Sequence, residues 1–308
     1  MKRQAFNPYL TEYEYIPDGE PYLFGDRVYV YGSHDRFGAP MFCMNDYVCW
    51  SAPADDLSDW RYEGVIYRKN QDPKNRLGIR LLFAPDVARG MDGKEDESHA
   101  SNYIGNTHGG ILHLNGKYYI FYHRHTNRSS YARQACAEEI TMDENGMFRQ
   151  AEMTSCGLNG GPLKGVGTYP ARIACNLWSK DGTGRYDCKN PKKAFAEHPY
   201  FTQDKKDGDG SARQYIANMR DGAVAGFKYF VMGEAKEISV ELAGKAKGKM
   251  LVSGNRDFSA INAEIPVENL NNVKTDFTAK LIAGKGKRAL YFEYKGEGYV
   301  DFISFTLK

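Results

Sequence analysis

The chain has 308 residues, enough to bury roughly three quarters of its unfolded surface in one or two domains. Its 41 Lys and Arg residues nearly balance 39 Asp and Glu residues, so the formal charge of +2 gives no indication of nucleic-acid binding. No apolar run is long enough to span a membrane, which excludes a helical membrane protein. The 22 Tyr and 32 Gly residues favour strands and turns over helices.

The N-terminal residues, MKRQAFNPYL, include two basic side chains but no apolar segment behind them, so we expect no signal peptide. Six cysteines show neither CxxC pairs nor the spacing of metal ligands, which indicates reduced thiols in strands and loops. Together these features predict a cytoplasmic protein of bacterial type.

The stretch from Pro17 to Asp35 predicts a hairpin. Asp18 precedes a turn at Gly25-Asp26, and Val28–Tyr31 then alternates apolar and aromatic residues as a strand does. The strand ends on a polar triplet, Ser-His-Asp, that closes the stretch.

The same pattern returns twice. In Leu82–Lys94, Asp86 precedes a glycine by seven residues, as Asp18 does; in Asn106–His125, His108 precedes Gly116 by eight, and an aromatic strand follows. A repeated unit of polar residue, short strand, glycine turn and Tyr-rich strand is typical of propeller blades, whose innermost strands aim polar residues at a central channel.

The repeat breaks after Lys94. A Tyr-rich strand should follow, but Glu95–Ser101 is acidic and does not alternate. Charge runs of this kind are usually solvated loops. The sequence therefore predicts a blade without its second strand, and a seam at this point.

The expected strands divide the chain into three parts. Four strands are expected in the first sheet, at 22–24, 27–31, 46–51 and 61–66, and short strands from residue 214 onward are typical of a β-sandwich. The latter are expected at 226–232, 237–242, 249–253, 278–281, 289–294 and 299–307. We predict a propeller over 1–160, an extended, irregular linker over 161–213 and a sandwich over 214–308.

Several long motifs resemble glycoside hydrolase family 43, whose nearest members are β-xylosidase and α-L-arabinofuranosidase relatives. They are IPDGEPYLFGDRVYVYGSHD, NDYVCWSAPADDLSDWRYEG, LFAPDVARG, YIGNTHGGI, GKYYIFYHRHT, YARQACAEEI and EMTSCGLNGGPL. The resemblance implies a five-bladed β-propeller, followed here by a sandwich like a family 6 carbohydrate-binding module. We therefore expect an all-β fold, an incomplete propeller and then a β-sandwich, acting on arabinose- or xylose-containing saccharides.

That family hydrolyses terminal sugars with inversion, using a general-base Asp, an Asp that tunes pKa and a general-acid Glu. The resemblance assigns the base to Asp18, for which a turn aspartate that holds backbone N–H groups is the alternative. The motifs of the other two carboxylates are absent. Because the repeat also breaks between Lys94 and Glu95, we infer an internal deletion there that removed most of blade two and blades three and four.

The resemblance also implies substrate-binding residues. Arg133 matches an arginine that reaches the sugar, with a surface salt bridge as the alternative, and His108 matches a histidine that faces substrate or a metal–water cluster. Three further residues match strand ends near the pocket of the family: Asp86, His34 and Asp35. A purely structural role is the equally weighted alternative for each. No cofactor is expected, apart from a structural calcium or sodium ion in the propeller channel, to which His108 is the expected ligand.

Three hypotheses follow. The first is a glycosidase by descent whose turnover suffers from the lost acid, for which Glu95, Glu97, Glu138 and Glu139 are weak substitutes. The second is a non-catalytic protein that binds xylan-type chains through the sandwich. The third is an assembly in which exposed sheet edges of the shortened propeller pair with another copy.

Overall fold

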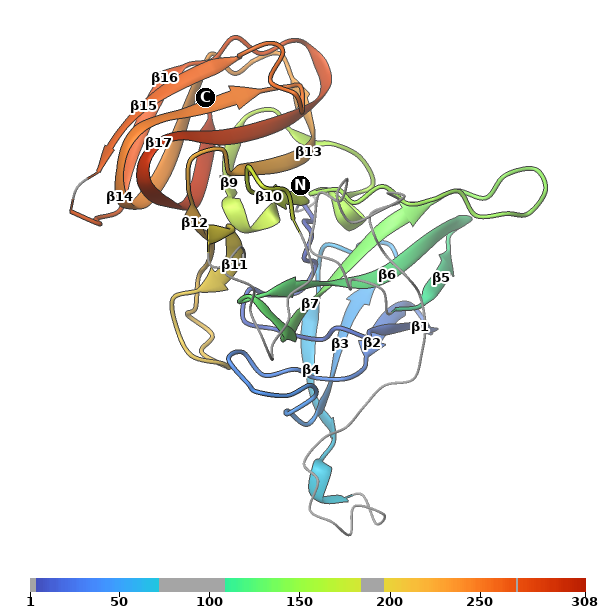
Figure 1. The fold of residues 1–308 in the computed structure, drawn as a ribbon. Coiled ribbons are helices and arrows are strands. Elements are labelled where there is room, and N and C mark those ends of the chain that lie inside the picture. Colours follow the sequence, from blue (N-terminus) through green and yellow to red (C-terminus); the bar gives the residue numbers. More distant parts are fainter. Residues whose placement is uncertain (1–3, 72–108, 184–196, 270) are drawn as a thin grey trace.

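The computed structural model describes residues 4–71, 109–183, 197–269 and 271–308. Strands dominate these residues, and the short 3-10 turns are η1 (Lys69–Gln71), η3 (Gly157–Asn159) and η4 (Ala171–Ile173). No helix in the described ranges is long and apolar enough to cross a membrane. The predicted all-β class is confirmed. Figure 1 shows a large C-terminal sandwich in orange and red above two smaller sheets in blue and green.

The first sheet is a four-stranded antiparallel meander in the order β1-β2-β3-β4. Its strands are β1 (Glu20–Phe24), β2 (Arg27–Tyr31), β3 (Tyr47–Pro53) and β4 (Arg61–Tyr67). The predicted turn between β1 and β2 is confirmed, and Gly25 adopts the positive φ of 62° that the turn requires.

The second sheet has three strands, β5 (Ile111–Leu114), β6 (Lys117–Thr126) and β7 (Ser129–Ile140), in sequence order. Asn115 and Gly116 connect β5 to β6 with φ of 52° and 75°. Two successive positive φ values are those of a type I′ hairpin turn, which Asn-Gly strongly favours.

These two sheets share one apolar core. Val28 and Val30 of β2 are fully buried and belong to the same cluster as Leu112 of β5 and Phe121 of β6. The alternation that predicts the first hairpin therefore places its valines inward. No closed propeller sheet is formed by the described residues, and β1, β4, β5 and β7 are sheet edges among them. Self-association through such edges stays a prediction.

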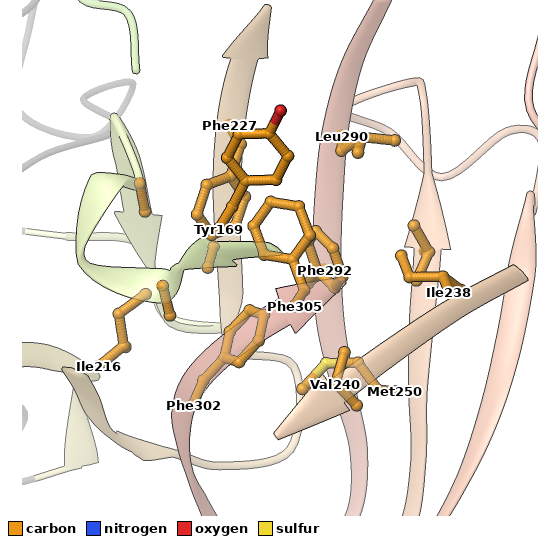
Figure 2. Packing of buried hydrophobic residues seen from close by; sticks show 14 of the residues in the cluster. Tyr169, Ile216, Phe227, Ile238, Val240, Met250, Leu290, Phe292, Phe302 and Phe305 are labelled. Atoms are coloured by element: carbon orange, nitrogen blue, oxygen red, sulfur yellow. The ribbon is translucent and has the colours of Figure 1, made fainter. Parts of the chain in front are cut away.

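The sandwich is built around two long strands, β14 (Glu237–Ser253) and β17 (Gly286–Leu307), which pair along most of their length. The other strands are β8 (Leu163–Lys164), β9 (Gly167–Pro170), β10 (Asn176–Trp178), β11 (Tyr200–Gln203), β12 (Gln214–Met219), β13 (Val224–Met232), β15 (Ala263–Asn269) and β16 (Thr275–Lys280). Phe227, Phe292, Phe302 and Phe305 pack against one another at its centre (Figure 2).

Two pairs of expected strands are each one continuous strand. The strands expected at 237–242 and 249–253 form β14, and those at 289–294 and 299–307 form β17. The intervening glycines predict turns, but in the structure they allow the backbones of the paired strands β14 and β17 to approach each other closely. At Gly248 a Cβ would collide with the carbonyl of Lys295, so the two backbones meet where no side chain fits.

The first part of the segment 161–213, which was expected to be an irregular linker, forms strands of the sandwich instead. Strand β8 pairs with β13, β9 with β17 and β10 with β13. Tyr169 and Leu177 are buried in the sandwich core. These strands have two to four residues, too few to show a periodic pattern, so composition alone indicated a linker.

Candidate active site

Asp18 lies at one end of the first sheet. Because β1 and β2 are antiparallel, with Glu20 opposite Tyr31, residues just before β1 lie beside residues just after β2. Gly32 passes so close to Asp18 that a Cβ there would overlap its carbonyl oxygen. Ser33 then donates a hydrogen bond from Oγ to Oδ2 of Asp18. The carboxylate is held in a buried position, only 6% exposed.

Arg133 of β7 reaches the same place and bridges two carboxylates. Its Nε and Nη2 donate to Asp35 at 2.8 and 3.1 Å, and its Nη1 lies 3.3 Å from Oδ1 of Asp18. The guanidinium also lies over the ring of Phe42, 4.7 Å from its centre. Burial alone would lower the pKa of Arg133, but Asp35 and Asp18 outweigh it and raise that pKa. Arg133 is therefore a buried cation and not a surface salt bridge.

Asp35 anchors this arginine. It is fully buried and accepts two hydrogen bonds from the guanidinium and two more from the backbone N–H groups of Arg133 and Cys43, at 3.1 and 2.9 Å. A carboxylate with this many donors is held rigidly in one place. Asp35 thus positions Arg133 next to Asp18. We call Asp18, Ser33, Asp35, His123 and Arg133 the Asp18 cluster.

His123 of β6 is the member of this cluster that the sequence analysis missed. Its Nδ1 lies 3.2 Å from the carbonyl oxygen of Pro17 and 3.7 Å from Oδ1 of Asp18. Since a carbonyl oxygen only accepts, Nδ1 carries a proton. His125 lies on the same face of β6, with the two rings parallel and 5.7 Å apart. The available signal was this alternation of histidines in an aromatic strand.

His34 has different neighbours from those expected of a sugar-binding residue. Its Nε2 lies 2.7 Å from Glu14, and its Nδ1 lies 2.8 Å from the backbone oxygen of Asp46. Glu14 also accepts a hydrogen bond of 2.7 Å from the indole of Trp50. With an acceptor on each ring nitrogen, His34 is an imidazolium in a buried ion pair. Substrate binding by His34 stays a prediction, and both of its donors are already in use.

The pair predicts a pH dependence of stability. Burial alone would raise the pKa of Glu14 and lower the pKa of His34. Their mutual hydrogen bond and opposite charges outweigh burial, so the pKa of Glu14 lies below its ordinary value of 4.5 and the pKa of His34 lies above its ordinary value of 6.5. The pair is therefore fully formed between these two pH values; its contribution falls as pH drops through the folded pKa of Glu14 or rises through that of His34. We expect His34→Gln to cost about 3 kcal/mol in that window and progressively less at higher pH. Denaturant unfolding followed by the fluorescence of Trp50 and Trp60 in a Trp178→Phe background measures this; a cost independent of pH contradicts it.

Glu138 of β7 has the raised pKa of a general acid but the wrong location. Burial raises its pKa to about 8, opposed by hydrogen bonds from Thr154, Tyr122 and Asn7. Those donors lie 2.6 to 3.1 Å from its oxygens, and none belongs to the Asp18 cluster. Glu138 therefore joins the N-terminal segment to β6 and to the chain after β7. It is a structural carboxylate.

The remaining predicted residues divide into two groups. Glu139 is at the surface, with its Oε2 2.7 Å from Nζ of Lys117. Four residues lie outside the described ranges: Asp86, Glu95, Glu97 and His108. Within those ranges, no group of three or more His, Cys, Asp or Glu side chains is arranged to hold a metal ion. The structural ion expected with His108 stays a prediction.

Known proteins similar to this chain are carbohydrate-active. No family model matches it. A curated relative, "Xylosidase/arabinosidase" of Thermoclostridium stercorarium, is 33% identical over 474 aligned positions that cover 100% of this chain and 99% of the relative. Among solved structures, a glycoside hydrolase family 43 arabinoxylan arabinofuranohydrolase of Bacillus subtilis is 11% identical with a TM-score of 0.45, covering 94% of this chain. The chain spans 53% of that enzyme. A family 6 module of Clostridium stercorarium, solved with cellobiose, is 12% identical, has a TM-score of 0.37 and covers 48% of this chain and 98% of its own.

The length of the first alignment bears on the broken repeat. It spans 474 positions, whereas this chain has 308 residues, so 166 positions lie opposite no residue of this chain. An internal deletion produces such a difference; its location between Lys94 and Glu95 stays a prediction. Since the relative is 33% identical and similar from end to end, the chain belongs to glycoside hydrolase family 43 and is a glycosidase by family.

Proposed function

We propose that this chain recognises terminal α-L-arabinofuranosyl or β-D-xylosyl groups and retains the base, but not the acid, of an inverting glycosidase site. The observation that carries the proposal is the Asp18 cluster. Asp18 is buried beside Arg133 and Ser33, which fix its position. Asp35, the other carboxylate of the cluster, is fully engaged with Arg133.

The residues of the Asp18 cluster determine which hydrolysis reactions the site can support. In an inverting reaction, water attacks the anomeric carbon while the base takes one of its protons, and the glycosidic C–O bond breaks. Asp18 is the group that accepts this proton. The departing oxygen normally takes a proton from the acid. Without one, it must leave as an anion, which is easy only when the leaving group is itself a weak base. Activated glycosides are therefore the substrates that this site can turn over.

Asp18→Asn tests the role of the base. With dinitrophenyl β-D-xyloside and α-L-arabinofuranoside, whose leaving groups need no proton, we expect the substitution to lower kcat by ~10²–10⁴, the usual contribution of a general base. Asp276→Asn, at an exposed position of β16, is the matched control and should leave kcat unchanged. Equal turnover by the chain and by Asp18→Asn would rule out Asp18 as the base.

Carbohydrate binding without turnover is the alternative, and one observation favours it. The sandwich has a cleft of about 1100 Å³, here called the sandwich cleft, lined by Trp178, Tyr229 and Tyr291 among other residues. Aromatic rings with a few polar groups are typical of ligand sites. Phe227 and Phe230, two other aromatic residues of the sandwich, are fully buried in its core.

A further inference from the structure

We infer that the sandwich cleft binds a saccharide chain that carries carboxylate groups, as uronic-acid residues do. The inference rests on the proposed carbohydrate binding by the sandwich and adds the charge of the ligand. The cleft shares no residue with the Asp18 cluster. It is therefore a separate site whose occupancy can be measured without turnover.

The cleft offers rigid aromatic surfaces. Trp178 of β10 and Tyr291 of β17 lie with ring centres 6.2 Å apart. Tyr229 of β13 is held in place because its hydroxyl donates to Glu152 at 2.8 Å. Trp178 and Tyr229 are half-buried, so part of each ring remains accessible. Faces of this kind pack against the C–H groups of a sugar ring.

Cations surround these rings. The guanidinium of Arg256 lies 4.8 Å from the centre of the Trp178 ring, and Nζ of Lys287 lies 4.1 Å from that of Tyr229. Arg288 is a third cation of the lining. All three are exposed, and none forms an ion pair with a carboxylate in the part of the chain that the structure describes.

The lining contains one carboxylate, that of Asp257. It accepts the backbone N–H of Ser259 at 3.0 Å, so it serves the turn of its own loop. Glu152, just outside the lining, accepts from the Tyr229 hydroxyl and pairs with Lys228 at 3.1 Å. Within the lining, three cations thus face one locally engaged anion. The chain as a whole is almost neutral, with 41 basic and 39 acidic residues, so this excess is local and not a general property of the surface.

Charge complementarity then indicates the ligand. A neutral sugar would stack on the rings but would leave the three cations unused. A uronic-acid residue presents both an apolar ring face and a carboxylate, which guanidinium and ammonium groups bind with charge-assisted hydrogen bonds. Single-stranded nucleic acid combines stacking and negative charge in a similar way. We favour the saccharide because the chain belongs to a glycosidase family, and nucleic acid becomes an outcome of the test.

The test compares one polymer in two charge states. Binding of the full chain to glucuronoxylan and to the same polymer after carboxyl reduction is measured by affinity electrophoresis and calorimetry at low salt. We expect at least about tenfold tighter binding to the carboxylated polymer, a difference that shrinks as ionic strength rises. The double variant Arg256→Gln/Lys287→Gln, which keeps only Arg288 of the three cations, should lose most of this preference for the carboxylated polymer.

The control removes the same charge elsewhere. Lys247 of β14 is exposed and Lys249 is partly exposed, and they pair with Glu268 and Glu264 at 3.5 and 2.9 Å. Lys247→Gln/Lys249→Gln should bind like the unchanged chain. Equal affinity for the two polymers would overturn the charge assignment while leaving carbohydrate binding intact, and no binding to either would overturn both. Equally tight binding of oligothymidylate would show a general anion site and also overturn the proposal.

Discussion

Replacing Arg133 by Met is expected to lower the free energy of unfolding of the N-terminal part by about 3–5 kcal/mol. The substitution keeps most of the side-chain volume but removes the cation between Asp18 and Asp35. Both carboxylates would then be buried without their counter-charge, and Asp35 is fully inaccessible to water. Leaving a buried charge uncompensated costs far more than an exposed ion pair contributes.

The measurement is denaturant unfolding followed by tryptophan fluorescence. The chain has three tryptophans, of which Trp50 and Trp60 lie in or beside the first sheet. A Trp178→Phe background therefore makes the signal report on the N-terminal part alone. Lys117→Met, which removes one member of an exposed pair in the second sheet, is the control and should cost less than about 1 kcal/mol. A midpoint for Arg133→Met equal to that of the control would refute the buried bridge.

A second large effect is expected in the dependence of turnover on the leaving group. A general acid contributes ~10²–10⁴ in rate by protonating a poor leaving group and contributes little to a good one. In the described part of the chain, no carboxylate is both near Asp18 and free for this role: Asp35 is bound by Arg133, and Glu138 by donors outside the cluster. We therefore expect the rate to fall steeply as the leaving group becomes more basic.

The features that the sequence predicted well are local. The turns at Gly25 and at Asn115-Gly116 depend on two residues each, and the inward position of Val28 and Val30 follows from alternation within one strand. These interactions need no knowledge of the rest of the fold. The all-β class and the first sheet were predictable for that reason.

The Asp18 cluster was only partly predictable. Asp18 and Arg133 are 115 residues apart, and their proximity was expected only through the family resemblance. The pairing of His34 with Glu14 and the contact of His123 with Pro17 depend on how loops pass each other. No periodic pattern encodes such contacts, so the sequence identified His34 but not its role.

Trp178 shows a different reason for a missed residue. It lies in β10, a strand of three residues inside a segment rich in glycine, proline and lysine. Its strand is defined by pairing with β13, where Trp178 is opposite Val224. A strand that exists only through a distant partner gives no local signal. Trp178 could therefore not be assigned to the wall of the sandwich cleft before its partner strand was known.

Turnover of the unchanged chain on a series of xylosides and arabinofuranosides, from dinitrophenyl through nitrophenyl to methyl leaving groups, tests the central claim most directly. A site with Asp18 as base and no acid predicts measurable turnover of the dinitrophenyl glycosides, lowered ~10²–10⁴-fold by Asp18→Asn, and rates for the methyl glycosides lower by at least the ~10²–10⁴ that an acid supplies. A shallow dependence, with methyl glycosides hydrolysed nearly as fast as activated ones, would show that the chain still assembles a general acid and would contradict the account.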